Sequence, residues 1–222
     1  MSAAVPSDGL RVRIVGTGLI GASLGMALSR KGFRVSLADP SPTAAALARD
    51  LGAGVLTADS VGFPDVVVVA APPDVVADVV AGELLQWPNA VVTDAASVKG
   101  SVLRALQDRG VDLSRYVGSH PMAGRERSGA VAAQVDLFEG RSWVVAPGPQ
   151  ASAGAIEVVR RSAAAAGSAV VVMTPYDHDA AVAVVPPVPQ SDDMLAAGPL
   201  RSRPSGPRGP ASPGLQRGPP TG

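Results

Sequence analysis

Short runs of valine, isoleucine and other β-branched residues alternate with longer alanine-rich segments between residues 11 and 174. The short runs predict buried strands, and the longer segments, most of which end in glycine, predict helices. Strand–helix alternation on this spacing favours an α/β fold with a mostly parallel sheet. We expect strands at 11–15, 34–39, 65–73, 90–94, 141–147 and 168–174, and helices at 19–32, 42–52, 74–87, 97–110 and 151–167.

The composition of the 222-residue chain fits such a sheet. Hydrophobic residues make up 46% of the chain and aromatic residues only 3%, so alanine and valine supply most of the apolar surface. Valine-rich strands covered by alanine-rich helices are typical of parallel sheets that are buried on both faces. The formal net charge is zero, so there is no basic excess to attract nucleic acid or a membrane surface.

Several kinds of functional site and of cellular location are disfavoured because the sequence lacks the residues or segments that they require. There is no cysteine, so disulfides, thiolate catalysis and cysteine-ligated metals are excluded, and we predict no metal site. The start, MSAAVPSDGL, does not resemble a signal peptide, and no apolar run reaches the roughly 18 residues of a membrane span. We therefore expect a cytoplasmic protein.

The composition changes abruptly near residue 186. Proline, glycine, serine and arginine dominate residues 186–222, and such a segment cannot bury enough apolar surface to offset its loss of conformational entropy. We expect a flexible N-terminus over 1–10, a folded domain over 11–182 and a disordered tail over 186–222. The tail is either a solvated segment without a partner or a proline-rich ligand for a peptide-binding domain.

A glycine-rich turn joins the first predicted strand to the first predicted helix. Its residues are Gly16, Thr17, Gly18, Leu19, Ile20 and Gly21. Between a strand and a helix, this spacing is typical of a dinucleotide site in a doubly wound, Rossmann-type sheet, with the pyrophosphate at the helix N-terminus. Gly16 permits the tight turn, Gly18 admits the pyrophosphate, and Gly21 allows the helix to pack closely on the strand. The alternative is an ordinary strand–turn–helix with packing glycines.

Asp39 ends the second predicted strand, about twenty residues after the glycines. A carboxylate at this position accepts hydrogen bonds from the adenosine ribose hydroxyls and repels a 2′-phosphate, so Asp39 favours NAD over NADP. The alternative is that Asp39 caps the helix predicted at 42–52, a role compatible with ribose binding. Ala71 and Pro72 end the third predicted strand, where they either line the nicotinamide side or simply terminate the strand.

Two polar segments follow later strands. Asp94 and Ser97 lie in TDAASVKG, where either side chain could simply cap the next helix. His120 lies in GSHPMAG, which we interpret as a loop whose proline fixes the backbone and whose glycines let a ligand approach. A histidine titrates near neutral pH and suits a general base. Because oxidation of an alcohol requires a base beside the nicotinamide, these residues indicate an NAD-dependent dehydrogenase acting on a hydroxyl.

Five segments together resemble the prephenate/arogenate dehydrogenase family of tyrosine biosynthesis. They read VGTGLIGASLGMAL, TDAASVKG, GSHPMAGRERSG, LFEGRSWVVAP and MTPYDHDAAVA, in this order. The resemblance covers residues 11–185. It implies NAD-dependent oxidative decarboxylation of a small-molecule substrate, either prephenate, giving 4-hydroxyphenylpyruvate, or arogenate.

The resemblance also implies roles for individual residues. His120 matches the histidine that deprotonates the ring hydroxyl, and Ser97 matches the serine that positions this hydroxyl and the histidine. The glycines of the turn match the dinucleotide glycines. His178, in YDHD, matches a motif at the entrance to the second domain, where a substrate role and a helix-start capping role are the alternatives.

The resemblance ends after Val185. The family continues with a Ser-His-Leu-Pro type segment and an all-helical domain that forms the homodimer and supplies an arginine for the substrate carboxylate. Here PPVPQ and the low-complexity tail follow, and no tail arginine lies in a matching motif: Arg201, Arg203, Arg208 and Arg217. We therefore expect a frameshifted or truncated product without the dimerisation domain. It is either a dehydrogenase or a catalytically silent NAD-binding remnant of one.

Overall fold

The computed structural model describes residues 9–123 and 129–184. The chain divides into a unit of Met1–Val185 and a second unit of Pro186–Gly222, and all described residues belong to the first. The tail predicted over 186–222 and nearly all of the flexible segment predicted over 1–10 lie outside the described residues.

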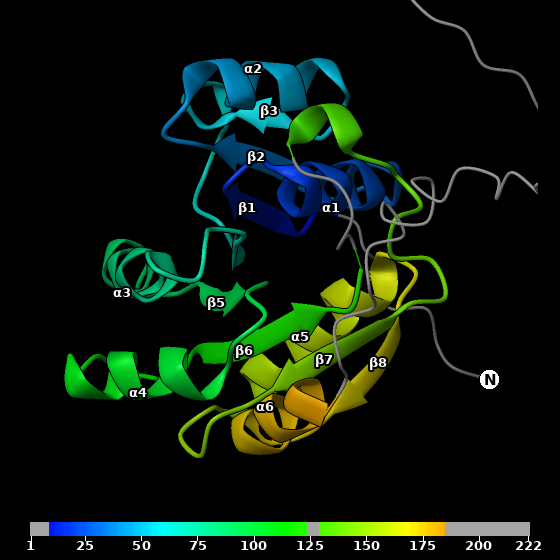
Figure 1. The fold of residues 1–222 in the computed structure, drawn as a ribbon. Helices are drawn as coiled ribbons and strands as arrows, with labels where there is room; N and C mark the ends of the chain where they lie inside the picture. Colours follow the sequence, from blue (N-terminus) through cyan, green and yellow to red (C-terminus); the bar gives the residue numbers. More distant parts are fainter. Residues whose placement is uncertain (1–8, 124–128, 185–222) are drawn as a thin grey trace, which may run out of the picture. The chain divides into compact units, whose positions relative to one another are not determined.

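Eight strands of the described chain form one sheet in the order β3-β2-β1-β4-β5-β6-β7-β8 (Figure 1). Strands β1 to β6 pair in parallel, β7 is antiparallel to β6, and β8 is parallel to β7. This sheet confirms the α/β, mostly parallel, Rossmann-type fold. The strands are β1 (Arg11–Val15), β2 (Arg34–Ala38), β3 (Val55–Leu56), β4 (Val66–Val69), β5 (Val91–Asp94), β6 (Tyr116–Pro121), β7 (Ser142–Ala146) and β8 (Ala169–Val172).

Helices cover both faces of the sheet (Figure 1). They are α1 (Leu19–Arg30), α2 (Pro42–Asp50), α3 (Val76–Gln86), α4 (Gly100–Asp108), α5 (Ala153–Ala165) and α6 (Pro175–Val184). In β4, Val66 and Val68 join the core under α1 and α5, whereas Val67 and Val69 join the core under α3 and α4. No helix in the described ranges is long and apolar enough to cross a membrane.

Local signals set the ends of the first two helices. Gly32, with a φ of 83°, follows the C-terminus of α1, where a left-handed conformation is needed to reverse the chain. Ser41 is the N-cap of α2, and its hydroxyl accepts a hydrogen bond from the backbone N–H of Ala44 at 3.3 Å. A serine cap of this kind contributes about 1 kcal/mol. The alternative that Asp39 caps α2 is therefore wrong.

The segment that we interpreted as a loop around His120 is a strand. The sequence YVGSHP forms β6, whose residues are all buried. Only its first two residues, Tyr116 and Val117, favour a strand, and glycine, serine, histidine and proline follow them. Pairing with β5 on one side and β7 on the other supplies the hydrogen bonds that the local sequence does not predict.

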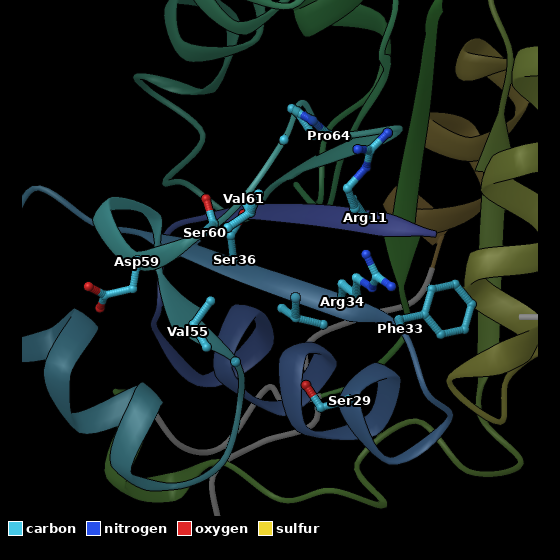
Figure 2. Close-up of a pocket in the computed structure, with 13 residues that line it drawn as sticks. Arg11, Ser29, Phe33, Arg34, Ser36, Val55, Asp59, Ser60, Val61 and Pro64 are labelled. Carbon is cyan, nitrogen blue, oxygen red and sulfur yellow. The ribbon is translucent and has the colours of Figure 1, made fainter. Parts of the chain in front are cut away.

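A pocket of about 370 Å³ opens at the amino-end edge of the sheet (Figure 2). Arg11 and Arg34, the first residues of β1 and β2, line it together with Val61 and Pro64 from the segment before β4. The predicted site residues lie at or just after the carboxyl ends of the parallel strands. This pocket is therefore at the opposite edge from them.

Candidate functional site

The glycine turn, the end of β2 and the end of β4 meet where the strand order reverses. From β1 the chain moves outward to β2 and β3, then returns to place β4 on the other side of β1. The backbone N–H of Gly16 donates to the carbonyl of Ala38 at 2.8 Å, and that of Ala70 donates to the carbonyl of Val15 at 2.7 Å. Open α/β sheets bind ligands at such a switch point.

The three glycines of the turn have different surroundings. Gly16 has a φ of 95°, and a Cβ there would lie 2.4 Å from the carbonyl oxygen of Ala70. A Cβ at Gly21 would lie 1.9 Å from the carbonyl oxygen of Gly16. Gly18 is exposed, and a Cβ there would have no atom within 4 Å. Gly16 and Gly21 are therefore required by packing, whereas Gly18 leaves open space in front of the turn.

That open space faces the start of α1. Gly18 is the N-cap of this helix and provides no side-chain cap, and the first turn contains no acidic residue. The first N–H groups, which belong to Leu19, Ile20 and Gly21, are those that an α-helix leaves without backbone partners. Together with the positive end of the helix dipole, they suit an anionic group such as a phosphate.

Asp39 connects the end of β2 to the glycine turn. Its Oδ2 accepts hydrogen bonds from the backbone N–H of Thr17 at 2.7 Å and from the Thr17 hydroxyl at 2.9 Å. Its Oδ1 accepts from the N–H of Ser41 at 2.8 Å. Oδ2 already accepts two hydrogen bonds but Oδ1 accepts only one, so Oδ1 keeps a lone pair for a further donor while the side chain holds the turn.

Ala71 and Pro72 follow β4, which ends at Val69. Ala71 is half-buried and Pro72 is exposed. The carbonyl of Pro72 accepts the N–H groups of Val75 and Val76, so this proline begins the turn into α3. Both predicted roles remain compatible here: the segment terminates a strand and also lies beside the glycine turn.

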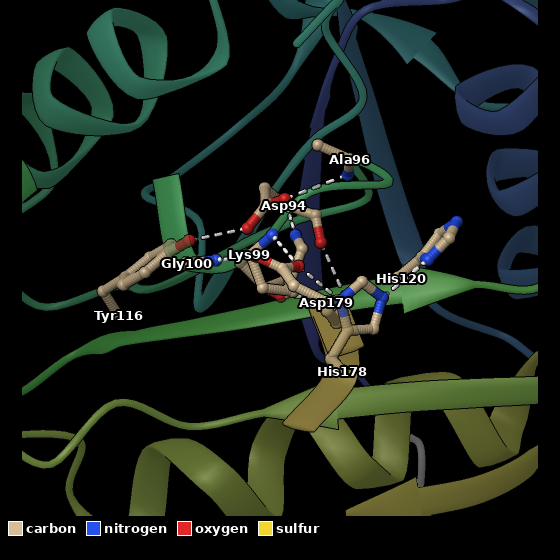
Figure 3. Close-up of polar contacts among 10 residues, drawn as sticks. Asp94, Ala96, Lys99, Gly100, Tyr116, His120, His178 and Asp179 are labelled. Carbon is tan, nitrogen blue, oxygen red and sulfur yellow. Dashed lines mark hydrogen bonds and ion pairs between the residues drawn. The ribbon is translucent and has the colours of Figure 1, made fainter. Parts of the chain in front are cut away.

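His120 lies near the end of β6 and is 8% exposed. Its Nδ1 is 2.9 Å from Nε2 of His178, which lies on α6 and is 1% exposed (Figure 3). Nδ1 of His178 is in turn 2.8 Å from Oδ1 of Asp179. The structure thus joins the chain's two histidines, which are 58 residues apart, and aligns them with a carboxylate.

Asp179 also caps α4. Its Oδ1 accepts the N–H of Lys99 at 2.9 Å and its Oδ2 accepts that of Gly100 at 2.8 Å. The alternative that Asp94 or Ser97 caps this helix is therefore wrong. Partial burial tends to raise the pKa of Asp179, but the hydrogen bonds from His178 and the two N–H groups outweigh it and lower this pKa below 3.8.

Beneath this helix start lies a buried polar cluster (Figure 3). Lys99 forms an ion pair with Asp94, and the side chains are 1% and 0% exposed. Asp94 also accepts the Tyr116 hydroxyl at 2.7 Å and the N–H of Ala96 at 2.9 Å. Burial lowers the pKa of Lys99, with Asp94 opposing this shift, and burial and Asp94 together raise the pKa of Tyr116. The cluster fixes the β5–α4 loop.

Ser97 is exposed on that loop, and its side chain makes no hydrogen bond with any other described residue. Two residues later the loop bonds to Asp179 through Lys99. Ser119, next to His120, is instead buried and donates to the carbonyl of Asp94 at 2.7 Å.

Within the described ranges, no three acidic, histidine or cysteine side chains are grouped to hold a metal ion.

The family model for the nucleotide-binding domain of prephenate dehydrogenase matches residues 24–178 of this chain. The chain belongs to the prephenate dehydrogenase family. It is 39% identical over 193 residues to a Streptomyces niveus protein named probable prephenate dehydrogenase NovF, a match that covers 87% of this chain and 53% of that protein.

Two solved structures of related enzymes share the fold. Arogenate dehydrogenase from Synechocystis is 25% identical, with a TM-score of 0.71 and coverage of 78% of this chain and 63% of that one. Prephenate dehydrogenase from Aquifex aeolicus, solved with hydroxyphenyl propionate and NAD+, is 30% identical, with a TM-score of 0.70 and coverage of 79% and 64%. This chain spans about half the length of the curated prephenate dehydrogenases it matches.

The sequence patterns did not indicate that three further residues belong to the site: Lys99, Tyr116 and Asp179. One signal was available, since Lys99 is one of only two lysines in the chain and follows directly after the polar TDAAS segment. The contact of Asp179 with α4 joins residues 80 apart and leaves no local pattern.

Proposed function

We propose that this chain binds NAD at the glycine turn and uses His120 as the base in the oxidative decarboxylation of prephenate to 4-hydroxyphenylpyruvate. The observation that carries the proposal is that the glycine turn and His120 lie at the same end of the sheet. Because β1, β4, β5 and β6 are parallel neighbours, their carboxyl ends meet at one edge of the sheet. An extended ligand that starts at the turn after β1 must cross β4 and β5 to reach His120.

The residues at this edge fit NAD. Gly18 and the start of α1 would hold the pyrophosphate, and Asp39 would accept hydrogen bonds from the adenosine ribose and repel a 2′-phosphate. Ala71 and Pro72 would line the path toward the nicotinamide. The structure of the Aquifex aeolicus relative with NAD+ supports this choice of cofactor.

His120 would perform the proton transfer. It accepts the proton of the ring hydroxyl as hydride leaves the ring carbon that carries this hydroxyl, and the electrons of the O–H bond form the second bond between that carbon and its oxygen. A bound NAD would supply the acceptor for this hydride. Carbon dioxide then leaves, the electrons of its bond to the ring complete the aromatic system, and the ring oxygen, which gains the electrons of its second bond to carbon, takes the proton back from His120 to become the phenol hydroxyl. Ser97, exposed on the neighbouring loop, would orient the hydroxyl.

Two further candidates have specific support. The similarity to arogenate dehydrogenase from Synechocystis favours arogenate, the transaminated form of prephenate, as an alternative substrate. The family model that matches residues 24–178 describes a nucleotide-binding domain, which favours an NAD-binding module without turnover of its own.

One experiment separates these candidates. The chain is titrated calorimetrically with NAD and NADP and is then assayed for NADH formation with prephenate and with arogenate. Selective binding of NAD supports the cofactor site, and the substrate that yields NADH identifies the reaction. NAD binding without turnover supports the module, and failure to bind NAD overturns every candidate.

A further inference from the structure

The hydrogen bonds around His178 determine which nitrogen of His120 carries a proton. Asp179 starts this chain of contacts, because its two oxygens accept from His178, from the N–H of Lys99 and from the N–H of Gly100. These three donors, with a lowered pKa, keep Asp179 as a carboxylate, which can only accept. Nδ1 of His178 must therefore carry its hydrogen.

The number of N–H donors on each ring then determines which of the other ring nitrogens carry a proton. A neutral imidazole has one N–H, so a His178 that donates from Nδ1 to Asp179 is an acceptor at Nε2. The nitrogen 2.9 Å from that Nε2 is Nδ1 of His120, which must then be the donor. His120 is left with its proton on Nδ1 and with Nε2 as the basic nitrogen.

We propose that His178 and Asp179 are positioning residues that hold His120 in the tautomer with a basic Nε2, and that this nitrogen accepts the substrate proton. The inference rests on the proposed function of His120 as the base. It gives His178 a role distinct from both substrate contact and helix capping. The capping of α6 belongs instead to Thr174, whose hydroxyl oxygen accepts the N–H of Asp177 at 3.1 Å.

Asp179 has a second effect on the site. The same carboxylate that orients His178 accepts the N–H groups of Lys99 and Gly100, directly after the exposed Ser97. One side chain on α6 therefore fixes both the orientation of the base and the end of the loop that presents Ser97. A change at Asp179 should disturb the two together.

The test is nitrogen NMR of the whole chain labelled with ¹⁵N-histidine. The chain has two histidines and hence four ring nitrogens, which single variants assign. At neutral pH we expect both Nδ1 atoms to be protonated and both Nε2 atoms to be unprotonated. A proton on Nε2 of His120, or a doubly protonated His178, would overturn the proposal. The measurement needs neither NAD nor substrate, so its result is independent of whether the proposed function holds.

Variants separate positioning from simple stability. Asp179→Asn should shift His120 to a mixture of tautomers, whereas Asp177→Asn, an exposed carboxylate on the same helix, should leave both spectra unchanged. If Asp179→Asn does not fold, His178→Phe serves instead, because it keeps a ring of similar shape and removes the acceptor for Nδ1 of His120. Either folded variant that retains the wild-type His120 tautomer contradicts the proposal.

Discussion

Nδ1 of His120 lies 2.9 Å from Nε2 of His178, although one residue belongs to β6 and the other to α6. Each histidine alone gives no more than a weak functional signal in the sequence. The contact makes them one unit with Asp179, and it places that unit at the edge of the sheet where the glycine turn also lies.

Replacing His120 should remove catalysis without removing the cofactor site. In a full-length relative, the change of the corresponding histidine to asparagine should lower kcat by about 10²–10⁴-fold, the usual contribution of a general base. In this chain, His120→Asn should leave NAD affinity unchanged. Steady-state kinetics and a calorimetric titration check the two statements. A full-length variant that keeps its kcat would show that this histidine is not the base.

Alanine substitutions of Gly18 and Gly21 should have different effects. Gly21→Ala should destabilise the fold, because the added Cβ would lie 1.9 Å from a backbone oxygen. Gly18→Ala should fold with an unchanged Tm, because its Cβ would meet no protein atom within 4 Å, yet it should weaken NAD binding. Thermal unfolding and NAD titration measure the two effects. Normal NAD affinity in Gly18→Ala would argue against a pyrophosphate at this position.

Asp39 should control the choice between NAD and NADP. Asp39→Asn removes the charge that would repel a 2′-phosphate and weakens the charged hydrogen bonds to the ribose, each worth about 1.5–3 kcal/mol. We expect NAD affinity to fall by about tenfold or more, and the ratio of NAD to NADP affinity to fall with it. Asp50→Asn, an exposed carboxylate at the end of α2, is the control. An unchanged ratio would place the ribose elsewhere.

The Lys99–Asp94 pair should be strongly coupled. Lys99→Met leaves a fully buried carboxylate without its cation, and breaking such a pair typically costs about 3–5 kcal/mol. Adding Asp94→Asn should recover part of this loss, because the double variant buries no unpaired charge. Urea unfolding of the four proteins gives the coupling energy. Additive effects of the two changes would mean that the pair does not interact as the geometry indicates.

Asp179 should make the fold sensitive to acid. Its pKa is lowered in the folded chain, so its contribution to stability is fully present above its unfolded pKa, near 3.8, and is lost as the pH falls through the folded pKa. The difference in unfolding free energy between the wild type and Asp179→Asn should therefore be largest near neutral pH and shrink below about pH 4. Denaturant unfolding at several pH values measures it. A difference that is constant with pH would contradict this assignment.

Local sequence signals predicted much of the fold but not the contacts within the site. The strand at 11–15 matches β1 to the residue and the helix at 19–32 overlaps all of α1, because valine runs and glycine punctuation act over a few residues. Strand β6 was missed because its conformation depends on pairing with β5 and β7. The predicted strand at 65–73 ends early, at Val69, where the chain turns toward α3.

The same distinction holds for the site. Gly16, Gly18, Gly21 and Asp39 lie together because a strand–turn–helix unit and the adjacent strand place them there, and the sequence pattern encodes that unit. The contact of His178 with His120 depends on how α6 packs against α4 and β7. No residue spacing in the sequence predicts that packing.

Titration of NAD into this chain and into its His120→Asn and Gly18→Ala variants tests the central claim most directly. We predict saturable one-to-one binding by the wild type, the same dissociation constant for His120→Asn, and weaker binding for Gly18→Ala. Absence of saturable NAD binding by the wild-type chain would contradict the account.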